Sequence, residues 1–595
     1  MFTTRPDLLG TFGMVASTHW LASAAGMAML ERGGNAFDAA VAAGFVLQVV
    51  EPHLNGPGGE VPILLYDSGR ALTRVVCGQG VAPRAATIEA FRDLGLDMIP
   101  GSGLLPAVVP GAFDAWLVML RDHGTLDLSD VLEPAIGYAE RGYPLAPGAA
   151  AAIAAAAPAF RADWPSSAAV YLPNDAPPPA GGLFRNPALA VTYKRILADS
   201  AAVATAREAR IEAARRLWYQ GFVAEAIDRF CRSNEVMDVS GRPHRGLLTG
   251  DDLVDWEATY ERPLTYDYHD LVVCKTAPWG QGPVFLQQLA LLRDIDLAAM
   301  DPLGDAFVHT VVEAAKLALA DREAWYGDPW FVDVPVGTLL SDAYNAERRR
   351  LIGKAASHEL RPGAPDGRTP RLPTLPDLPP GADPAATGEP TVRHAGPADG
   401  DTCHVDVVDR HGNMVSATPS GGWLQSSPVI PELGFCLSTR AQMFWLDPAM
   451  PSALGPGRRP RTTLTPTLVL KDGVAHRAFG TPGGDQQDQW SLILFLRHVH
   501  HGMTLQQAID APAFHTGHVP SSFWPRRAAP ASLSIETRFP ERTLRALERR
   551  GHVVQRTGDW SLGRLSAVGR RDTADGPVLE GAANPRFMQG YAVGR

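Results

Sequence analysis

The chain has 595 residues, enough for two large domains or about four of average size. Hydrophobic residues make up 45% of it and charged residues 20%, a composition that excludes a mostly disordered chain. A net charge of −10, without any long lysine or arginine run, argues against nonspecific binding to nucleic acid or to an anionic membrane. The expected partner is therefore a small molecule or a peptide.

The sequence contains no signal for export, membrane insertion or a bound cofactor. Polar side chains interrupt residues 7–19, so no continuous apolar export segment is present there. No stretch reaches the roughly 18 apolar residues that a membrane-spanning helix needs. The five cysteines are far apart without a C-x-x-C pair, and Walker A, G-x-S-x-G and dinucleotide motifs are absent. We expect a cytoplasmic protein with no metal and no cofactor.

The first third of the chain predicts helices followed by strands. Residues 18–51 read as two helices separated by a Gly-Gly pair, the second beginning at Asn35 as its N-cap. Short apolar strands are predicted at 63–66 and 72–76, after a G-P-G-G turn. This order predicts a helical layer next to a sheet.

A long helical region follows and ends in a proline-rich connector. Residues 107–330 are mostly helical by pattern, including 306–325, with a loop and a short helix predicted in the Ala/Pro-rich segment 145–182. Residues 361–400 contain ten prolines and cannot bury enough apolar surface to fold by themselves. We therefore expect a mobile connector there.

The segment after the connector predicts antiparallel strands. Residues 404–409 and 414–418 form a predicted hairpin, and 467–470 with 475–480 form another. A helix is predicted at 490–497, behind a P-G-G turn. Helices before the connector and strands after it indicate stacked α and β layers.

A connector that ends at Asp401-Thr402, directly before a buried strand, suggests a cleavage site. Cleavage before Thr402 would give this residue a free α-amine beside its own hydroxyl, and the amine can act as general base for the nucleophile. An α-amine has a pKa of roughly 8, close to what catalysis at neutral pH requires. A loop that simply enters a strand at threonine is the structural alternative.

The turn at Gly483-Gly484 offers a matching electrophilic site. Consecutive glycines between a strand and a helix leave backbone N–H groups free to face an anion. Such donors stabilise a tetrahedral acyl intermediate by about 3 to 4 kcal/mol each. A plain glycine turn is the alternative here.

Together these residues resemble the γ-glutamyltransferase family of N-terminal nucleophile hydrolases. The similarity extends over nearly the whole chain, and the order and spacing of its motifs make it specific. The matching stretches are 33–40, 51–59, 109–111, 313–316, 320–322, 327–329, 401–404, 407–409, 412–413, 459–460, 466–467 and 482–484.

The resemblance implies an α+β fold, a four-layer αββα sandwich, made as one inactive chain that cuts itself before Thr402. The products would be a mostly helical large subunit, 1–401, and a small subunit, 402–595, held together as a heterodimer. Thr402 would attack an acyl amide while Gly483 and Gly484 hold the oxyanion, and the acyl-enzyme would pass to water or to an amine acceptor.

The resemblance also assigns supporting hydroxyl groups. Ser420 occupies the position of a hydroxyl that supports the nucleophile, and we include Thr418 with it. Thr462 and Thr463 replace a pair of serines that contact the donor carboxylate in the family. Hydroxyl donors are thus retained at these places.

Departures from the family pattern affect the expected substrate. Gln79 stands in place of an arginine, Gly422 in place of an asparagine, and Trp445, three residues after Gln442, in place of an aspartate. These changes remove groups that hold the γ-glutamyl α-carboxylate and α-amine, and Trp445 with Trp423 offers apolar area instead. A donor without the α-amine is expected, as in the acylase-like branch that cleaves glutaryl-type amides.

Several alternatives remain open at this point. Cys403 would become the N-terminal nucleophile if cleavage fell one bond later. The histidines at 498–501 are interpreted as stabilising a helix C-terminus, and His309 with Glu313 as a structural hydrogen bond, because no third ligand is evident. A true glutathione hydrolase and an unprocessed, non-catalytic relative are the rival functions.

Overall fold

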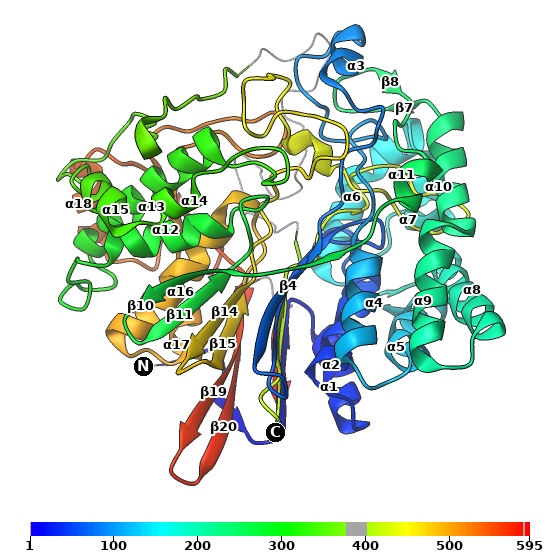
Figure 1. Cartoon of the computed structure of the whole chain (residues 1–595), viewed down its shortest axis with the longest axis horizontal. Coiled ribbons are helices and arrows are strands. Elements are labelled where there is room, and N and C mark those ends of the chain that lie inside the picture. The colour runs from blue at the N-terminus through cyan, green and yellow to red at the C-terminus, as the bar shows by residue number, and fades with distance from the viewer. Residues whose placement is uncertain (1, 376–401, 587–589) are drawn as a thin grey trace.

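A computed structural model describes residues 2–375, 402–586 and 590–595. Two seven-stranded sheets lie face to face, and a layer of helices covers the outer face of each (Figure 1). The four-layer αββα sandwich expected from the sequence is therefore confirmed.

Each sheet combines strands from before and from after residue 401. The first sheet has the order β1-β20-β19-β15-β14-β11-β10 and the second β21-β2-β12-β13-β3-β4-β9. Their bounds are β1 Leu8–Gly10, β2 Gly13–Ser17, β3 Val61–Asp67, β4 Leu72–Gly78, β9 Thr259–Glu261, β10 Leu264–Tyr268, β11 Leu271–Lys275, β12 Val405–Asp409, β13 Met414–Ala417, β14 Thr467–Lys471, β15 Val474–Gly480, β19 Ser566–Thr573, β20 Gly576–Ala583 and β21 Tyr591–Gly594.

This interleaving fixes the two halves of the chain to one another. The short strand β2 pairs antiparallel with β12 and β21, and β11 pairs with β14. Alternate residues of both sheets meet in a shared apolar core that includes Met14, Leu64 and Val568. The two halves would remain associated through these ladders and this core after a backbone cut at residue 401.

One helical layer packs on the sheet that contains β12. Helices α1 and α2 follow the predicted pattern, and Asn35 caps α2 with Asp38 completing a capping box. This layer comprises α1 Trp20–Glu31, α2 Ala36–Val50, α4 Ala112–His123, α5 Leu128–Arg141, α8 Pro187–Val203, α9 Arg207–Tyr219 and α10 Phe222–Ser233.

The other helical layer packs on the sheet that contains β15, and helices from both halves of the chain contribute to it (Figure 1). The predicted helices 306–325 and 490–497 correspond to α13 and α16. The layer comprises α12 Gly282–Leu292, α13 Asp305–Trp325, α15 Asp342–Arg349, α16 Gln487–His501, α17 Leu505–Asp510 and α18 Glu541–Arg549.

Two segments differ from the sequence prediction. The Ala/Pro-rich stretch 145–182 is mainly helical, with α6 at Pro147–Ala162 and α7 at Pro165–Tyr171. Proline is compatible with the first helical position and alanine has the highest helix propensity, so the run folds as a helix rather than a loop.

The predicted mobile connector, 361–400, is anchored at its start. The amide of Gly363 donates to Asp321 at 2.6 Å, and Trp325 Nε1 donates to the Gly363 carbonyl at 3.1 Å. Arg361 forms an ion pair with Glu313 at 3.0 Å. The remaining part, 376–401, lies outside the described residues. Across the described parts of the chain, no helix is both long and apolar enough to span a bilayer.

Candidate active site

Thr402, the predicted nucleophile, lies buried just before β12. Its Oγ1 donates a hydrogen bond to Ser420 Oγ at 3.3 Å, and its carbonyl accepts one from Arg564 Nη2 at 3.3 Å. A β-bridge also joins Thr402 to Ser420. The structure therefore brings Thr402 and Ser420 together, whereas the other predicted cleavage residue, Asp401, lies outside the described residues.

The loop that carries Ser420 is held by the G-P-G-G turn. Bridges connect Ser420 to Glu60 and Gly421 to Asn55. The approach is so close that a Cβ on Gly56 would lie 2.2 Å from the carbonyl oxygen of Gly422. Gly422 itself has a φ of 64°, a conformation that glycine adopts without strain. The turn therefore supports the wall of the Thr402 site in addition to leading into a strand.

Arg440 is a site residue that sequence reasoning missed. Its Nη2 donates to Ser420 Oγ at 3.0 Å, and its Nε forms a close ion pair with Glu60. The guanidinium carbon lies 5.5 Å from the ring centre of Trp423 and 5.8 Å from that of Phe523. Arg440 is only 1% exposed, and its Nη1 has no hydrogen-bond partner among the described residues.

Gly483 and Gly484 lie between β15 and α16. Their φ values of 122° and 51° turn the backbone sharply, and a Cβ on Gly483 would lie 2.2 Å from Trp490 Cζ3. The amide of Arg564 donates to Thr481 Oγ1 at 3.0 Å while its side chain reaches the Thr402 carbonyl. Arg564 thus links the predicted oxyanion turn to the predicted nucleophile.

A buried charge network fixes the residue that follows the two glycines. Asp485 accepts from Arg322 at 2.5 Å and from Ser522 Oγ at 2.6 Å. Arg461 donates to Ser522 Oγ at 3.1 Å and lies 3.2 Å from Glu323. Although burial acts to raise it, the Arg322 and Arg461 guanidiniums lower the pKa of Asp485 below its usual value. The carboxylate therefore stays ionised and immobilises the turn.

The predicted carboxylate contacts are buried but only partly satisfied. Thr462 donates its amide to the Trp279 carbonyl at 2.9 Å, while Thr463 Oγ1 has no hydrogen-bond partner within the described ranges. Gln79 folds back on its neighbour, with Nε2 donating to the Gly80 carbonyl at 3.1 Å.

Gln442 and Trp445 contact the loop that carries Trp524 and Arg526. Gln442 Oε1 accepts from the Trp524 amide at 3.0 Å, and its carbonyl accepts from Arg526. Trp445 stacks under Arg526, whose guanidinium carbon lies 3.9 Å from the ring centre. Trp423 instead packs with Met443 and Phe523 in a small apolar cluster beside Arg440.

The remaining candidates next to Thr402 have other partners. Cys403 Sγ donates to Glu51 at 2.9 Å, and burial together with Glu51 raises the pKa of its thiol well above the usual range. Thr418 Oγ1 bonds to His404 Nδ1 at 2.9 Å rather than to Thr402, so any support it gives the nucleophile is indirect. A buried, protonated Cys403 is poorly suited to act as a nucleophile.

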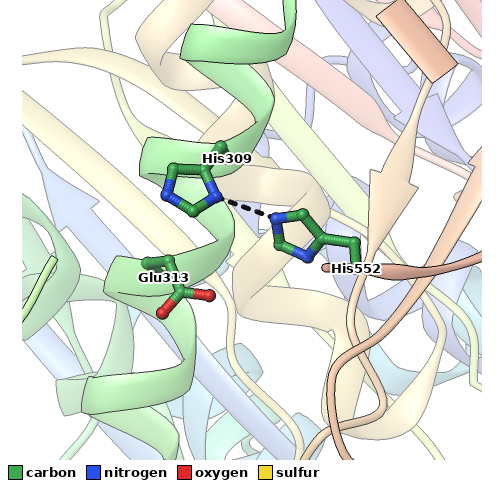
Figure 2. A group of neighbouring side chains, drawn as sticks. All are labelled: His309, Glu313 and His552. Atoms are coloured by element: carbon green, nitrogen blue, oxygen red, sulfur yellow. Dashed lines mark hydrogen bonds between the residues drawn. The ribbon is translucent and has the colours of Figure 1, made fainter. Parts of the chain in front are cut away.

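The expectation that His309 and Glu313 have no third neighbour was wrong. His552, from the other half of the chain, accompanies them, and its Nε2 lies 2.9 Å from His309 Nδ1 (Figure 2). Glu313 is already ion-paired with Lys316 at 2.7 Å and with Arg361. Two cations already occupy the carboxylate, so we interpret the group as a structural link between the halves. Local sequence patterns do not show that His552 lies beside His309, which comes 243 residues earlier in the chain.

The histidines at 498–501 end α16 as expected. His498 Nδ1 contacts the Met503 carbonyl at 2.7 Å, and His500 Nε2 contacts the Tyr268 hydroxyl at 2.8 Å. Gly502 terminates the helix in the left-handed conformation with a φ of 63°.

A four-layer αββα fold with a threonine at the start of an inner strand and a glycine turn at the end of another defines an N-terminal nucleophile hydrolase. The family model for gamma-glutamyltranspeptidase matches residues 22–594, and the chain belongs to this family.

Similar proteins include a glutathione hydrolase-like protein and an acylase. A glutathione hydrolase-like YwrD proenzyme of Bacillus subtilis is 30% identical, covering 99% of both chains. The solved structure of LmbA2991HD is 56% identical over 100% of both chains with a TM-score of 0.93. A cephalosporin acylase from Bacillus halodurans is 29% identical, with a TM-score of 0.82 over 100% of this chain and 97% of that one.

Proposed function

We propose that the protein is a self-processing amide hydrolase or acyltransferase that forms an acyl-enzyme on Thr402. The observation that carries the proposal is the hydrogen bond from Thr402 Oγ1 to Ser420, at the first described residue after the connector. Cleavage between Asp401 and Thr402 would release the α-amine beside this hydroxyl. The family relationship supports an enzyme made as a proenzyme.

In the proposed reaction, the Thr402 amine takes the hydroxyl proton while Oγ1 attacks the acyl carbonyl. Ser420, itself held by Arg440, orients the hydroxyl. The Gly483 and Gly484 amides donate to the developing oxyanion, because in the described structure neither has another acceptor. The protonated amine then gives its proton to the leaving amine, and water or an acceptor amine releases the acyl group.

The proposed donors are γ-glutamyl-like or glutaryl-like amides. Support for donors without an α-amine comes from the apolar cluster of Trp423, Met443 and Phe523, which offers no carboxylate to a ligand ammonium. The similarity to a cephalosporin acylase supports the same choice, whereas the similarity to a glutathione hydrolase-like protein favours a true glutathione hydrolase as the second candidate. A cytoplasmic location remains a prediction.

Matched substrates test the proposal. Purified, processed enzyme is assayed with glutaryl-4-nitroanilide and with γ-glutamyl-4-nitroanilide, which differ only in the α-amine. We expect a higher kcat/KM for the glutaryl compound and no turnover of either by Thr402→Ala. Equal or higher rates on the γ-glutamyl compound would favour the glutathione hydrolase, and turnover by Thr402→Ala would contradict the proposed nucleophile.

A further inference from the structure

The guanidinium of Arg440 has one edge occupied and one edge open. Nε pairs with Glu60 and Nη2 donates to Ser420 Oγ at 3.0 Å. Nη1 is buried and lacks an acceptor in the described parts of the chain. A buried N–H of a charged group without an acceptor destabilises the protein, so its presence indicates a place where a ligand supplies the acceptor.

The open edge lies close to the reaction centre. Ser420 Oγ accepts from both Thr402 Oγ1 and Arg440 Nη2, so a single hydroxyl separates the guanidinium from the predicted nucleophile. A group bound at Nη1 would therefore belong to the acyl part of the donor, a few bonds from the scissile carbonyl. This proximity restricts the donor to a short acyl chain.

The side chains around Arg440 hold the guanidinium rigidly and favour the binding of a negatively charged group. The rings of Trp423 and Phe523 lie near the guanidinium, and Met443 completes their cluster. These side chains offer no carboxylate, so the apolar surroundings strengthen any hydrogen bond that Nη1 makes. Packing against these two rings also restrains the planar guanidinium, which favours recognition of a planar carboxylate.

The charges beyond this cluster also favour an anion. Glu60 neutralises Arg440, but Arg526, which is fully buried, donates only to the carbonyls of Gln442 and Phe444 and pairs with no described carboxylate. Burial and the nearby Arg461 lower the pKa of Arg526 to about 9, which leaves it protonated at neutral pH. A ligand carboxylate would be stabilised in this region, whereas a ligand ammonium would be repelled.

We propose that Arg440 is the donor-specificity residue and that its Nη1 binds a carboxylate on the acyl chain. The preferred donors are then monoamides of short dicarboxylic acids that lack an α-amine. The inference deepens the proposed function and rests on it. Gln79 stands where the family has an arginine, and Arg440 supplies a cation at another position. The site therefore still recognises a carboxylate.

The test compares two donors that differ in charge but not in length. Glutaryl-4-nitroanilide carries a terminal carboxylate, and glutaramyl-4-nitroanilide carries a terminal amide in its place. We expect wild-type kcat/KM to favour the carboxylate by about 10- to 100-fold, mostly through KM. In the double variant Arg440→Gln/Glu60→Gln, which leaves no buried carboxylate unpaired, we expect the ratio to fall close to 1. Arg440→Lys should retain part of the preference.

Arg497→Gln is the matched control, because it removes a buried arginine that donates to the carbonyls of Pro302 and Pro512 and not to Ser420. A preference that persists in Arg440→Gln/Glu60→Gln, or one that is lost equally in Arg497→Gln, would overturn the inference. Glutarate binding, followed as a thermal shift of the processed protein, provides an independent readout. Stabilisation of wild type but not of the double variant supports the anion site. If glutarate stabilises the protein in this way but neither amide is hydrolysed, the proposed function is wrong and the anion site is still supported. Absence of stabilisation in wild type would refute the site.

Discussion

Replacing Ser420 by alanine probes the hydroxyl on which the site is built. Its Oγ accepts two hydrogen bonds, one from Thr402 Oγ1 at 3.3 Å and a charge-assisted one from Arg440 at 3.0 Å. A hydrogen bond to a charged group contributes about 1.5 to 3 kcal/mol, and a buried donor without a partner costs a similar amount. We expect Ser420→Ala to lower the free energy of unfolding by about 2 kcal/mol, chiefly through Arg440.

The comparison requires proteins with the same number of chains. Thr402→Ala provides an uncut background, so the unfolding of Thr402→Ala is compared with that of Thr402→Ala/Ser420→Ala by urea titration. We expect a lower midpoint with an unchanged slope, and recovery in Thr402→Ala/Ser420→Thr, which restores the hydroxyl. A change below about 0.5 kcal/mol would refute the reasoning, because even an average neutral hydrogen bond contributes that much.

Three further predictions concern the neighbours of this site and the link between the halves. Cys403→Ser should still process and retain activity, because the thiol is buried and protonated; mass spectrometry and a turnover assay check this. Gly483→Ala should lose about 2 to 5 kcal/mol of stability and most activity, from backbone strain and overlap with the Trp490 ring. In His552→Gln, the melting temperature should fall less between pH 7 and pH 5 than it does in the wild-type protein. Burial lowers the pKa of His552 to about 3, so below about 6.5 only the unfolded imidazole takes up a proton, and stability falls by up to about 1.4 kcal/mol per pH unit.

Each of these predictions has a control. Processing lost in Cys403→Ser would move the nucleophile to residue 403. Gly473→Ala adds a methyl at a positive φ with nothing within 4 Å, so it should cost clearly less than Gly483→Ala; equal costs would show that the Trp490 contact is unimportant. His411→Gln, at an exposed turn, is measured beside it as a second histidine variant. A wild-type slope in His552→Gln would contradict the assignment to His552.

Local sequence signals predicted the elements whose residues interact with close neighbours in the chain. The Asn35 capping box forms the expected start of α2, and the hairpin of β12 and β13 lies where alternation predicted it. A loop and one short helix were predicted for 145–182, but residues 147–162 form a long helix. Pro147 occupies the first helical position, where proline is tolerated.

The parts of the site that the sequence did not predict depend on distant pairs. Arg440 meets Glu60 across 380 residues of chain, and only folding shows that the guanidinium touches Ser420. The family resemblance directed attention to Gln442 and Trp445, which are close to Arg440 in the chain but stabilise the loop at Trp524 instead. The hydrophobic periodicity of a sequence predicts which residues are buried. It does not predict which buried polar groups pair with one another.

The αββα sandwich explains how a proenzyme of this kind can be cut without falling apart. Both sheets contain strands from before and after residue 401, and the His309–His552 contact joins the two halves again on the outer helical layer (Figure 2). A cut at the connector would change the chemistry at Thr402 while leaving every described ladder intact.

The central claim is that Thr402 becomes an N-terminal nucleophile, and the denatured mass of the purified protein tests it most directly. The account predicts two chains, the smaller beginning at Thr402, and a single uncut chain for Thr402→Ala. A wild-type protein that stays as one chain, or a small chain that begins at another residue, would contradict it.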